Sequence, residues 1–237
     1  MDIRKEKKDD VVICVKDLYK VFRVGETRVR ALNGVDFEIN RGEFCAIVGT
    51  SGSGKSTLLN MMAGLEKPTK GEIVIAGEHI EKKNENQLVA FRREHVGFIF
   101  QSFNLMPTMN AIENVALPLT FRGMGKTERT KKAEAMLELV GLSEHKYHRP
   151  GQMSGGQQQR VGVARALVLE PEIIFADEPT GNLDSNTSKE VMNLMKQVVY
   201  EKNQTLVMVT HDNLLASYAD VRIQISDGKV LKIERNS

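Results

Sequence analysis

Tryptophan is absent from this sequence of 237 residues, and cysteine occurs only twice. The two cysteines, Cys14 and Cys45, are far apart in the chain and show no metal-ligand spacing. Both stand among apolar residues with a strand-like pattern. The sequence therefore predicts two free, buried thiols in a reducing compartment rather than a disulfide or a metal site.

Long hydrophobic runs are also missing. No stretch approaches the roughly 18 consecutive apolar residues that a membrane-spanning helix needs. No signal-peptide pattern precedes the first predicted strand either. We therefore expect a cytoplasmic protein whose role at a membrane, if it has one, depends on a partner.

Neither sign of charge is in large excess. Charged residues make up 27% of the chain and the formal net charge is +2, which gives no electrostatic argument for nucleic-acid binding. The charge run from Arg4 to Asp10 is predicted to be a solvated terminus. What the chain does have is length and apolar content. With 41% hydrophobic residues it can bury the core of one large domain, or of a domain with a subdomain.

Short apolar segments recur along the chain and alternate with helical patterns. Strands are predicted over Val11–Val15, Val35–Ile39, Phe44–Val48, Ile73–Ile75, Gly97–Phe100, Ile173–Ala176 and Thr205–Val209. Phe44–Val48 is apolar at every position, which favours a parallel strand buried on both faces. Because helical patterns follow this strand and separate the last two, the sequence predicts an α/β core with a largely parallel sheet.

The middle of the chain has a different pattern. From about residue 103 to residue 166 the periodicity is helical and is interrupted by glycine and proline. His145 and His148 in this segment lack a third metal ligand, and we expect them on a solvated turn. We predict a single domain over 1–237, in which 1–101 and 161–237 form the core with its β subdomain and 102–160 form an inserted α-helical subdomain.

The strongest chemical signal is a glycine-rich segment between the predicted strand Phe44–Val48 and a predicted helix. Residues 49–56 read GTSGSGKS and match the phosphate-loop pattern G-x-x-x-x-G-K-[ST]. Glycines let successive backbone N–H groups point at one phosphate, and the helix N-terminus adds partial positive charge. Lys55 is predicted to bridge the β- and γ-phosphates of ATP, and the Ser56 hydroxyl to bind Mg²⁺. The nucleotide set predicted here is Gly49, Ser51, Gly52, Ser53, Gly54, Lys55, Ser56 and Thr57.

A second signal combines an apolar strand with two carboxylates. Residues 173–178 read IIFADE, so Asp177 and Glu178 stand at the C-terminal tip of a buried strand, where α/β proteins bind ligands. Asp177 is predicted to hold the Mg²⁺ shell, and Glu178 to orient or deprotonate the attacking water. The alternative is a pair of solvated carboxylates at a strand end. The presence of the phosphate loop favours the site.

Residues 153–157 read MSGGQ and form a second phosphate-binding pattern. Ser154 occupies a helix N-cap position, and Gly155 and Gly156 leave backbone N–H groups accessible. One nucleotide needs one such helix start, so we expect this one to serve the nucleotide of another subunit. At this point the chain resembles the ABC ATPase family, whose signature is usually written LSGGQ. Met153 replaces Leu and conserves volume. The resemblance covers essentially the whole chain, with every motif in family order.

This resemblance implies a fold and three further site residues. The fold is an α/β P-loop NTPase with a RecA-like core, an N-terminal antiparallel β subdomain and an inserted α-helical subdomain. Gln101 would contact Mg²⁺ or the attacking water, and His211 would contact the γ-phosphate. Phe22 would stack on the adenine, at a position where this family often has Tyr, and packing in its strand is the alternative.

The resemblance also implies an assembly. Two copies pair head to tail, and each ATP lies between the phosphate loop of one copy and the signature of the other. Loss of the γ-phosphate on hydrolysis would remove this bridge and open the pair. The implied cofactors are ATP and Mg²⁺, and no nucleic-acid partner is expected. The further nucleotide-binding residues that the resemblance implies are Ser154, Gly155, Gly156, Gln157 and, in a turn that crosses the interface between copies, Asp184.

Four segments resemble one branch of the family. FIFQSFNL at 98–105, ENVALPL at 113–119, SGGQQQR at 154–160 and DEPTGNLD at 177–184 are typical of the group that serves lipoprotein release, macrolide export and antimicrobial-peptide resistance. The implied partner is a permease with a large extracytoplasmic domain, which exports or extracts a lipoprotein, peptide or antibiotic. The chain would lie in the cytoplasm, peripheral on the inner face of the cell membrane through the permease. Met106-Pro107 stands in the region that accepts the permease in related proteins.

Three alternatives share part of this pattern. An ATP-driven regulator of a non-transporting membrane partner would carry every motif found here. A soluble ABC ATPase usually has two ATPase halves or a long coiled-coil insertion, and this sequence has neither. A nucleotide-binding module without catalysis is expected to lack Glu178 or His211, and both are present.

Overall fold

The computed structural model describes residues 10–236. Of the charge run from Arg4 to Asp10, every residue except Asp10 lies outside the described residues. The chain divides into two compact units. One contains the residues up to Arg92 together with those from Asn203 onward, and the other contains Arg93–Lys202. The segment boundaries predicted from the sequence stay a prediction.

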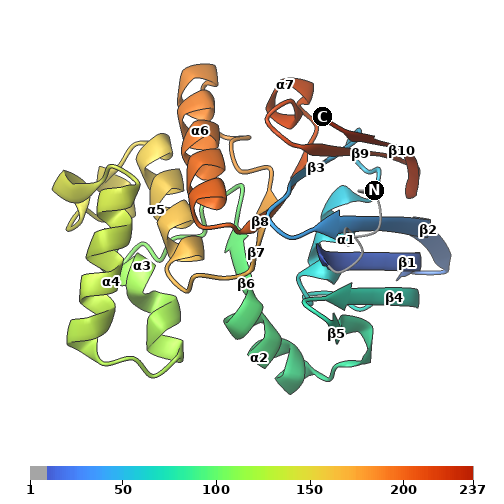
Figure 1. Cartoon of the computed structure of the whole chain (residues 1–237), viewed down its shortest axis with the longest axis horizontal. Coiled ribbons are helices and arrows are strands. Elements are labelled where there is room, and N and C mark those ends of the chain that lie inside the picture. Colours follow the sequence, from blue (N-terminus) through green and yellow to red (C-terminus); the bar gives the residue numbers. More distant parts are fainter. Residues whose placement is uncertain (1–9, 237) are drawn as a thin grey trace, which may run out of the picture. The chain divides into compact units, whose positions relative to one another are not determined.

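An antiparallel sheet in the first unit is built on a long hairpin (Figure 1). Strands β1 (Val11–Val24) and β2 (Thr27–Asn40) pair with each other, β4 (Lys70–Ile75) pairs with the other side of β1, and β5 (Glu78–His79) pairs with β4. This sheet is the antiparallel β subdomain expected from the sequence. The hairpin is longer than predicted because residues 27–30 are exposed and polar enough to hide the alternation.

A largely parallel arrangement forms the rest of the first unit. Strand β3 (Phe44–Val48) is buried at every residue and lies between β8 (Thr205–Thr210) and β9 (Val221–Ser226), both parallel to it. Strand β10 (Lys229–Arg235) pairs antiparallel with β9. A fully apolar strand is what burial on both faces requires. The remaining elements of this unit are α1 (Lys55–Met62), the 3₁₀ turn η2 (Ile80–Lys82) and α7 (Asn213–Ala216).

The second unit combines a pair of parallel strands with helices (Figure 1). Strands β6 (Val96–Ile99) and β7 (Ile173–Asp177) are neighbours. Helices α3, α4 and α5 pack against one another, and α6 packs on α5. This is the helical segment expected from the sequence. The helices are α2 (Glu85–His95), which spans the boundary between the units, α3 (Ala111–Phe121), α4 (Lys126–Leu139), α5 (Gly155–Leu167) and α6 (Ser185–Glu201), with 3₁₀ turns η3 (Ser143–His145) and η4 (Pro150–Gln152).

One buried side chain holds the segment that precedes α3. The Asn114 side-chain oxygen accepts the N–H of Met106 at 2.7 Å. Its amide nitrogen donates to three carbonyls, those of Met106 at 3.2 Å, Met109 at 3.1 Å and Asn110 at 3.0 Å. Because Asn114 is fully buried, these bonds are shielded from water and fix the backbone of 106–110. The Met106 side chain remains 45% exposed on this fixed segment.

The two histidines of the middle segment lie on a turn, as predicted, but their side chains are not fully solvated. Both are half-buried, and their ring centroids are 5.1 Å apart. The physical reason is that the turn is tied to the start of α3. The N–H of Ala111 donates to the His148 carbonyl at 2.9 Å, and the N–H of Ile112 donates to the Lys146 carbonyl at 3.1 Å.

Two absences noted in the sequence recur in the structure. Within residues 10–236 no helix combines the length and apolar character of a membrane span. Both cysteines are free, as expected. Cys45 is buried, whereas Cys14 is half-buried and donates its thiol to Glu38 at 3.6 Å.

Candidate nucleotide site

The predicted site residues divide between the two units. The first unit contains the phosphate loop, His211 and Phe22. The second contains Gln101, Asp177, Glu178, the signature residues 154–157 and Asp184. Each set forms its own local arrangement.

In the first unit, the phosphate loop and His211 leave the same edge of the parallel sheet. Val48 at the end of β3 lies opposite Thr210 at the end of β8. Gly49 and His211 therefore both follow carboxyl ends of parallel strands, the edge at which α/β proteins bind ligands. Phe22 lies on β1 in the other sheet of this unit, half-buried, with the Lys20 ammonium 4.9 Å from its ring centroid.

Gly54 shapes the junction between the loop and α1. It is the N-cap of α1 with φ of 101°, and no side chain in residues 10–236 caps this helix. A Cβ at this position would lie 2.5 Å from the Ala31 carbonyl oxygen, so only glycine fits. The helix start therefore faces the loop without a side-chain cap, and the positive end of its dipole favours an anion there.

Two side chains of the loop point inward. Lys55 is buried, and its Nζ donates to the carbonyls of Gly49 at 2.9 Å and Thr50 at 2.8 Å. Ser53 Oγ is buried without a hydrogen-bond partner in the described part of the chain. It faces Gly49, where a Cβ would lie 2.6 Å from this oxygen. Ser51, Gly52 and Ser56 are exposed, and Thr57 is half-buried.

These features fit a bound nucleotide phosphate. The loop holds a lysine ammonium among its own carbonyls, a buried hydroxyl without a partner, and helix N–H groups without a side-chain cap. All are donors that a phosphate can accept from. The exposed Ser56 hydroxyl in the first turn of α1 fits an Mg²⁺ ligand beside that phosphate.

In the second unit, Gln101 and the two carboxylates also leave one edge of a strand pair. Ile99 on β6 lies opposite Ala176 on β7. Gln101 and Glu178 therefore follow the two strands at the same end, and Asp177 is the last residue of β7. Glu178 has a φ of 42°, in the left-handed region that residues other than glycine rarely adopt. Such strain is concentrated at functional positions.

The turn after Glu178 contacts Gln101 directly. The Gly181 N–H donates to the Glu178 carbonyl at 3.0 Å. A Cβ on Gly181 would lie 2.9 Å from Gln101 Nε2, so the Gln101 side chain rests against this glycine. The Asn182 side chain donates to the Gln101 carbonyl at 3.0 Å. The structure thus brings Gln101 together with the turn that begins at Glu178.

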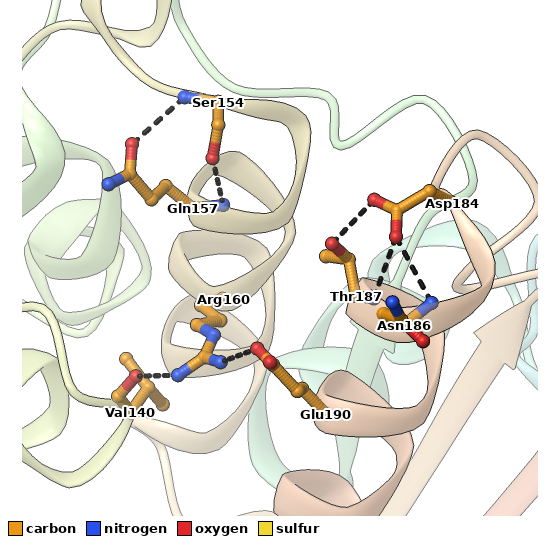
Figure 2. A network of polar contacts seen from close by, with 8 residues as sticks. All are labelled: Val140, Ser154, Gln157, Arg160, Asp184, Asn186, Thr187 and Glu190. Atoms are coloured by element: carbon orange, nitrogen blue, oxygen red, sulfur yellow. Dashed lines mark hydrogen bonds and ion pairs between the residues drawn. The ribbon is translucent and has the colours of Figure 1, made fainter.

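The signature begins α5 with a complete capping box (Figure 2). Ser154 Oγ accepts the N–H of Gln157 at 3.3 Å, and Gln157 Oε1 accepts the N–H of Ser154 at 2.9 Å. This reciprocal pair satisfies two of the donors at the helix start. The N–H groups of Gly155 and Gly156 are not part of it. They are the donors of this helix start that a ligand can use.

The amide of Gln157 has a second contact that the sequence did not reveal. Its Nε2 lies 3.0 Å from His145 Nε2. Since Gln157 Oε1 already accepts the Ser154 N–H, Nε2 is the donor toward His145. Both ends of this side chain are therefore engaged inside the second unit.

The start of α6 lies against the start of α5. A Cβ on Gly156 would lie 2.4 Å from Thr187 Cγ2. Asp184 caps α6 by accepting the N–H groups of Asn186 at 3.0 Å and Thr187 at 3.1 Å, and the Thr187 hydroxyl at 2.6 Å (Figure 2). The hydroxyl bond is the main cause that lowers the pKa of Asp184. Lower on the same two helices, Arg160 pairs with Glu190 at 2.8 Å.

Sequence reasoning missed three residues that support the site: His145, Asn182 and Arg165. Asn182 stands inside the segment DEPTGNLD, so its position in that segment was an available signal. His145 carried no such signal, because its contact with Gln157 depends on how the turn between them folds. Arg165 carried none either, because it donates to the carbonyls of Asn104 and Phe103, which lie far away in the chain.

The fold and the phosphate loop define a P-loop ATPase of the α/β class. A family model described as ABC transporter matches residues 32–181. An uncharacterized ABC transporter ATP-binding protein of Thermotoga maritima is 46% identical over 92% of this chain and 93% of its own length. The macrolide export ATP-binding/permease protein MacB of Hyphomonas neptunium is 46% identical over 95% of this chain, and the chain spans 35% of that relative.

Solved structures agree with these relatives. The dimeric structure of the ATP-binding cassette MJ0796 in a post-hydrolysis state, bound to ADP and Pi, has a TM-score of 0.88 and 42% identity, covering 95% of this chain and 99% of that one. The chain belongs to the ABC transporter family. It is an ATP-binding ATPase of this family, and its cofactors are ATP and Mg²⁺. The predicted fold class and enzyme class are confirmed.

Proposed function

We propose that two copies of this chain pair head to tail around two ATP molecules and drive a membrane permease. The observation that carries the proposal is the start of α5, where Gly155 and Gly156 offer N–H groups beside Ser154 in a unit without the phosphate loop. The dimeric state of MJ0796 and the name of MacB, an ATP-binding/permease protein, support it.

Each ATP is held by residues of both copies. The loop N–H groups and Lys55 bind its phosphates in one copy, and His211 contacts the γ-phosphate. Ser154 and the N–H groups of Gly155 and Gly156 bind the same γ-phosphate from the other copy. Because the Gln157 amide is engaged by Ser154 and His145, we assign Gln157 to holding this helix start rather than to phosphate contact.

Hydrolysis requires a positioned water and neutralised phosphate charge. Glu178 orients the water that attacks the γ-phosphorus and takes its proton, and the bond to the bridging oxygen of ADP breaks. Ser56, Asp177 and Gln101 are the residues that would hold Mg²⁺, which when bound neutralises charge on the β- and γ-phosphates. Asp184 keeps the start of α6 in place beside the signature. Phe22 supplies an aromatic face for the adenine.

The permease is proposed to carry a large extracytoplasmic domain and to export or extract a lipoprotein, a peptide or an antibiotic. The chain would act from the cytoplasm, on the inner face of the cell membrane. The exposed Met106 on the segment fixed by Asn114 is the proposed contact with the permease. Tagging the chain, solubilising native membranes gently and identifying co-purified proteins by mass spectrometry tests this. A membrane partner without transport activity would replace the transporter by a regulator, and no membrane partner would favour a soluble ATPase.

Glu178→Gln tests the hydrolytic assignment. The substitution keeps the size of the side chain and removes the base. ATP affinity should stay within about twofold, and phosphate release should fall by about 10²–10⁴-fold. ATP should also hold two copies together in this variant, seen as a doubled mass by light scattering, whereas ADP should not. Phosphate release at the wild-type rate would refute the role of Glu178.

Mixing two inactive variants tests the shared site. Lys55→Ala disables the phosphate loop and Ser154→Arg blocks the signature, so neither variant alone should hydrolyse ATP. A mixed pair contains one composite site in which both contributions are intact. Equal mixing should recover roughly a quarter of wild-type turnover, since half of the pairs are mixed and each has one working site. No recovery, in a mixture shown by differently tagged copies to form mixed pairs, would contradict the head-to-tail site.

A further inference from the structure

The turn that begins at Gln101 has strained backbone geometry. Phe103 and Asn104 both lie in the left-handed region, with φ of 59° and 49°. Residues other than glycine rarely adopt this region, and two in succession persist only where neighbouring groups hold them. The groups that hold this turn therefore help to set the position of Gln101, two residues earlier.

Arg165, in the last turn of α5, holds the turn from one side. Its guanidinium donates to the carbonyls of Asn104 at 2.5 Å and Phe103 at 2.8 Å. Its Cζ lies 5.9 Å from the centroid of the Phe100 ring. Arg165 thus contacts residues on both sides of Gln101.

The surroundings of Arg165 make this contact specific. The side chain is half-buried, and burial lowers the pKa of its guanidinium. No carboxylate within residues 10–236 pairs with it, and its hydrogen bonds go to the two carbonyls of one turn. A planar guanidinium that meets two neighbouring acceptors and a ring fixes their relative positions in a way that a lysine ammonium cannot.

The turn after β7 holds Gln101 from the other side. Asn182 donates its side-chain N–H to the Gln101 carbonyl at 3.0 Å. The Gln101 side chain rests against Gly181, whose N–H is bonded to the Glu178 carbonyl. Gln101 is consequently held between α5 and the residues that follow Glu178.

We propose that Arg165 is a positioning residue for ATP hydrolysis, which holds Gln101 in place and makes it follow the movement of α5. This inference rests on the proposed role of Gln101. Ser154 caps the first turn of α5 and Arg165 lies in its last, so ATP that displaces the helix at its start also displaces the turn that holds Gln101. Arg165 touches no reacting group and acts through the backbone around Gln101.

A double-mutant cycle between Arg165→Lys and Gln101→Ala tests the proposal. Arg165→Lys should lower kcat by about tenfold to a hundredfold, because a small misplacement of a positioned group has that effect. The KM for ATP should stay within about twofold, since the phosphate loop is untouched. In the Gln101→Ala background the same substitution should have little further effect, a dependence that a purely structural arginine would not show.

Arg129→Lys is the matched control. Arg129 is also half-buried and donates to a carbonyl, that of Met124 at 3.1 Å, but it holds the turn between α3 and α4. Its substitution should leave kcat unchanged in both backgrounds. Asn182→Ala serves if Arg165→Lys does not fold, because Asn182 is exposed. Asn182→Ala should lower kcat by about threefold, the effect of losing one neutral hydrogen bond. In the Gln101→Ala background it should not lower kcat further.

The outcomes separate this inference from the proposed function. Suppose that Gln101→Ala lowers kcat. If the kcat losses of Arg165→Lys and Gln101→Ala then add in the double variant, or if Arg165→Lys and Asn182→Ala both turn over normally, the positioning role of Arg165 is overturned and the proposed function stands. If Gln101→Ala itself turns over normally, the assigned role of Gln101 is overturned and this inference falls with it.

Discussion

Two helices of this chain begin at glycine-rich segments, and their first turns are built differently. At α1, the N-cap Gly54 has a left-handed backbone with φ of 101°, and no side chain in the described part of the chain caps the helix. At α5, Ser154 and Gln157 form a complete capping box, and Gly156 is pressed against Thr187 of α6. The first helix start is held by the backbone of its own loop, and the second by side chains and a neighbouring helix.

The difference indicates different tasks. A helix start without a side-chain cap, with a buried lysine ammonium held beside it by the loop carbonyls, suits the binding of an anion. A capped start is stable by itself and presents only the N–H groups that the cap leaves over. The first arrangement suits a site whose own backbone and lysine bind the phosphates. The second suits a helix start that keeps its shape whether or not a ligand is bound.

Gly54→Ala should produce the largest effect, because it breaks the first helix start. A Cβ at φ of 101° is strained and would also lie 2.5 Å from the Ala31 carbonyl oxygen. ATP affinity should fall on the order of a hundredfold, the equivalent of the upper range of such strain. Equilibrium binding of a fluorescent ATP analogue measures it.

Gly77→Ala is the control that separates the effect of an alanine at positive φ from the effect of its place in the phosphate loop. Gly77 has φ of 79° and nothing within 4 Å of an added Cβ, and it lies in the turn between β4 and β5. It should lower stability by about 1 kcal/mol and leave ATP affinity unchanged. Equal ATP affinity for the two variants would show that the loop tolerates a side chain at Gly54.

Gly156→Ala should have an intermediate effect, at the second helix start. Its Cβ would lie 2.4 Å from Thr187 Cγ2 and push α5 away from α6. We expect turnover to fall about tenfold, because the signature shifts, and ATP affinity of the isolated chain to stay the same. Steady-state phosphate release and analogue binding give the two readings.

Thr187→Ser is the matched rescue. Serine removes the methyl group that clashes and keeps the hydroxyl that Asp184 accepts. The double variant Gly156→Ala with Thr187→Ser should recover both the melting temperature and turnover. Recovery of the melting temperature alone would mean that the Gly156 surface itself must stay open for the ligand, rather than that the two helices must stay close.

Ser154→Ala should have the smallest effect and sharpens the meaning of the cap. Loss of this N-cap should lower stability by about 1 kcal/mol. Asn110→Ala, at the capping box that Asn110 and Glu113 form at the start of α3, should lower it by a similar amount. Only Ser154→Ala should also lower turnover, by about threefold to tenfold. Equal turnover for the two variants would reduce Ser154 to a purely structural cap.

The parts of this protein that were predictable from the sequence are those set by local chemistry. Phe44–Val48 is apolar throughout and forms a buried strand. Ser154 followed by Gln157 at the third helical position formed the expected helix start. The α/β fold class followed from the order of such segments, and it is confirmed. The roles of individual residues in ATP hydrolysis stay predictions.

The parts that were missed depend on contacts between distant residues. Strands β9 and β10 were not predicted, and their position beside β3 is a matter of pairing across the sheet. His145 was expected in solvent, but backbone hydrogen bonds join its turn to the start of α3, so its side chain is half-buried. In the sequence, Arg165 has no feature that distinguishes it from other helix arginines. Only the structure shows that it donates to the carbonyl of Phe103.

The sequence by itself predicted the phosphate loop, because glycine spacing and a lysine act over a few residues of one chain. It also determined the strands that must be buried, since an apolar run cannot remain in water. Only the tertiary structure decided what holds these pieces in place. The tie from Arg165 to the turn at Gln101 and the contact of Gly156 with Thr187 join residues that are far apart in the chain, and no local pattern encodes that proximity.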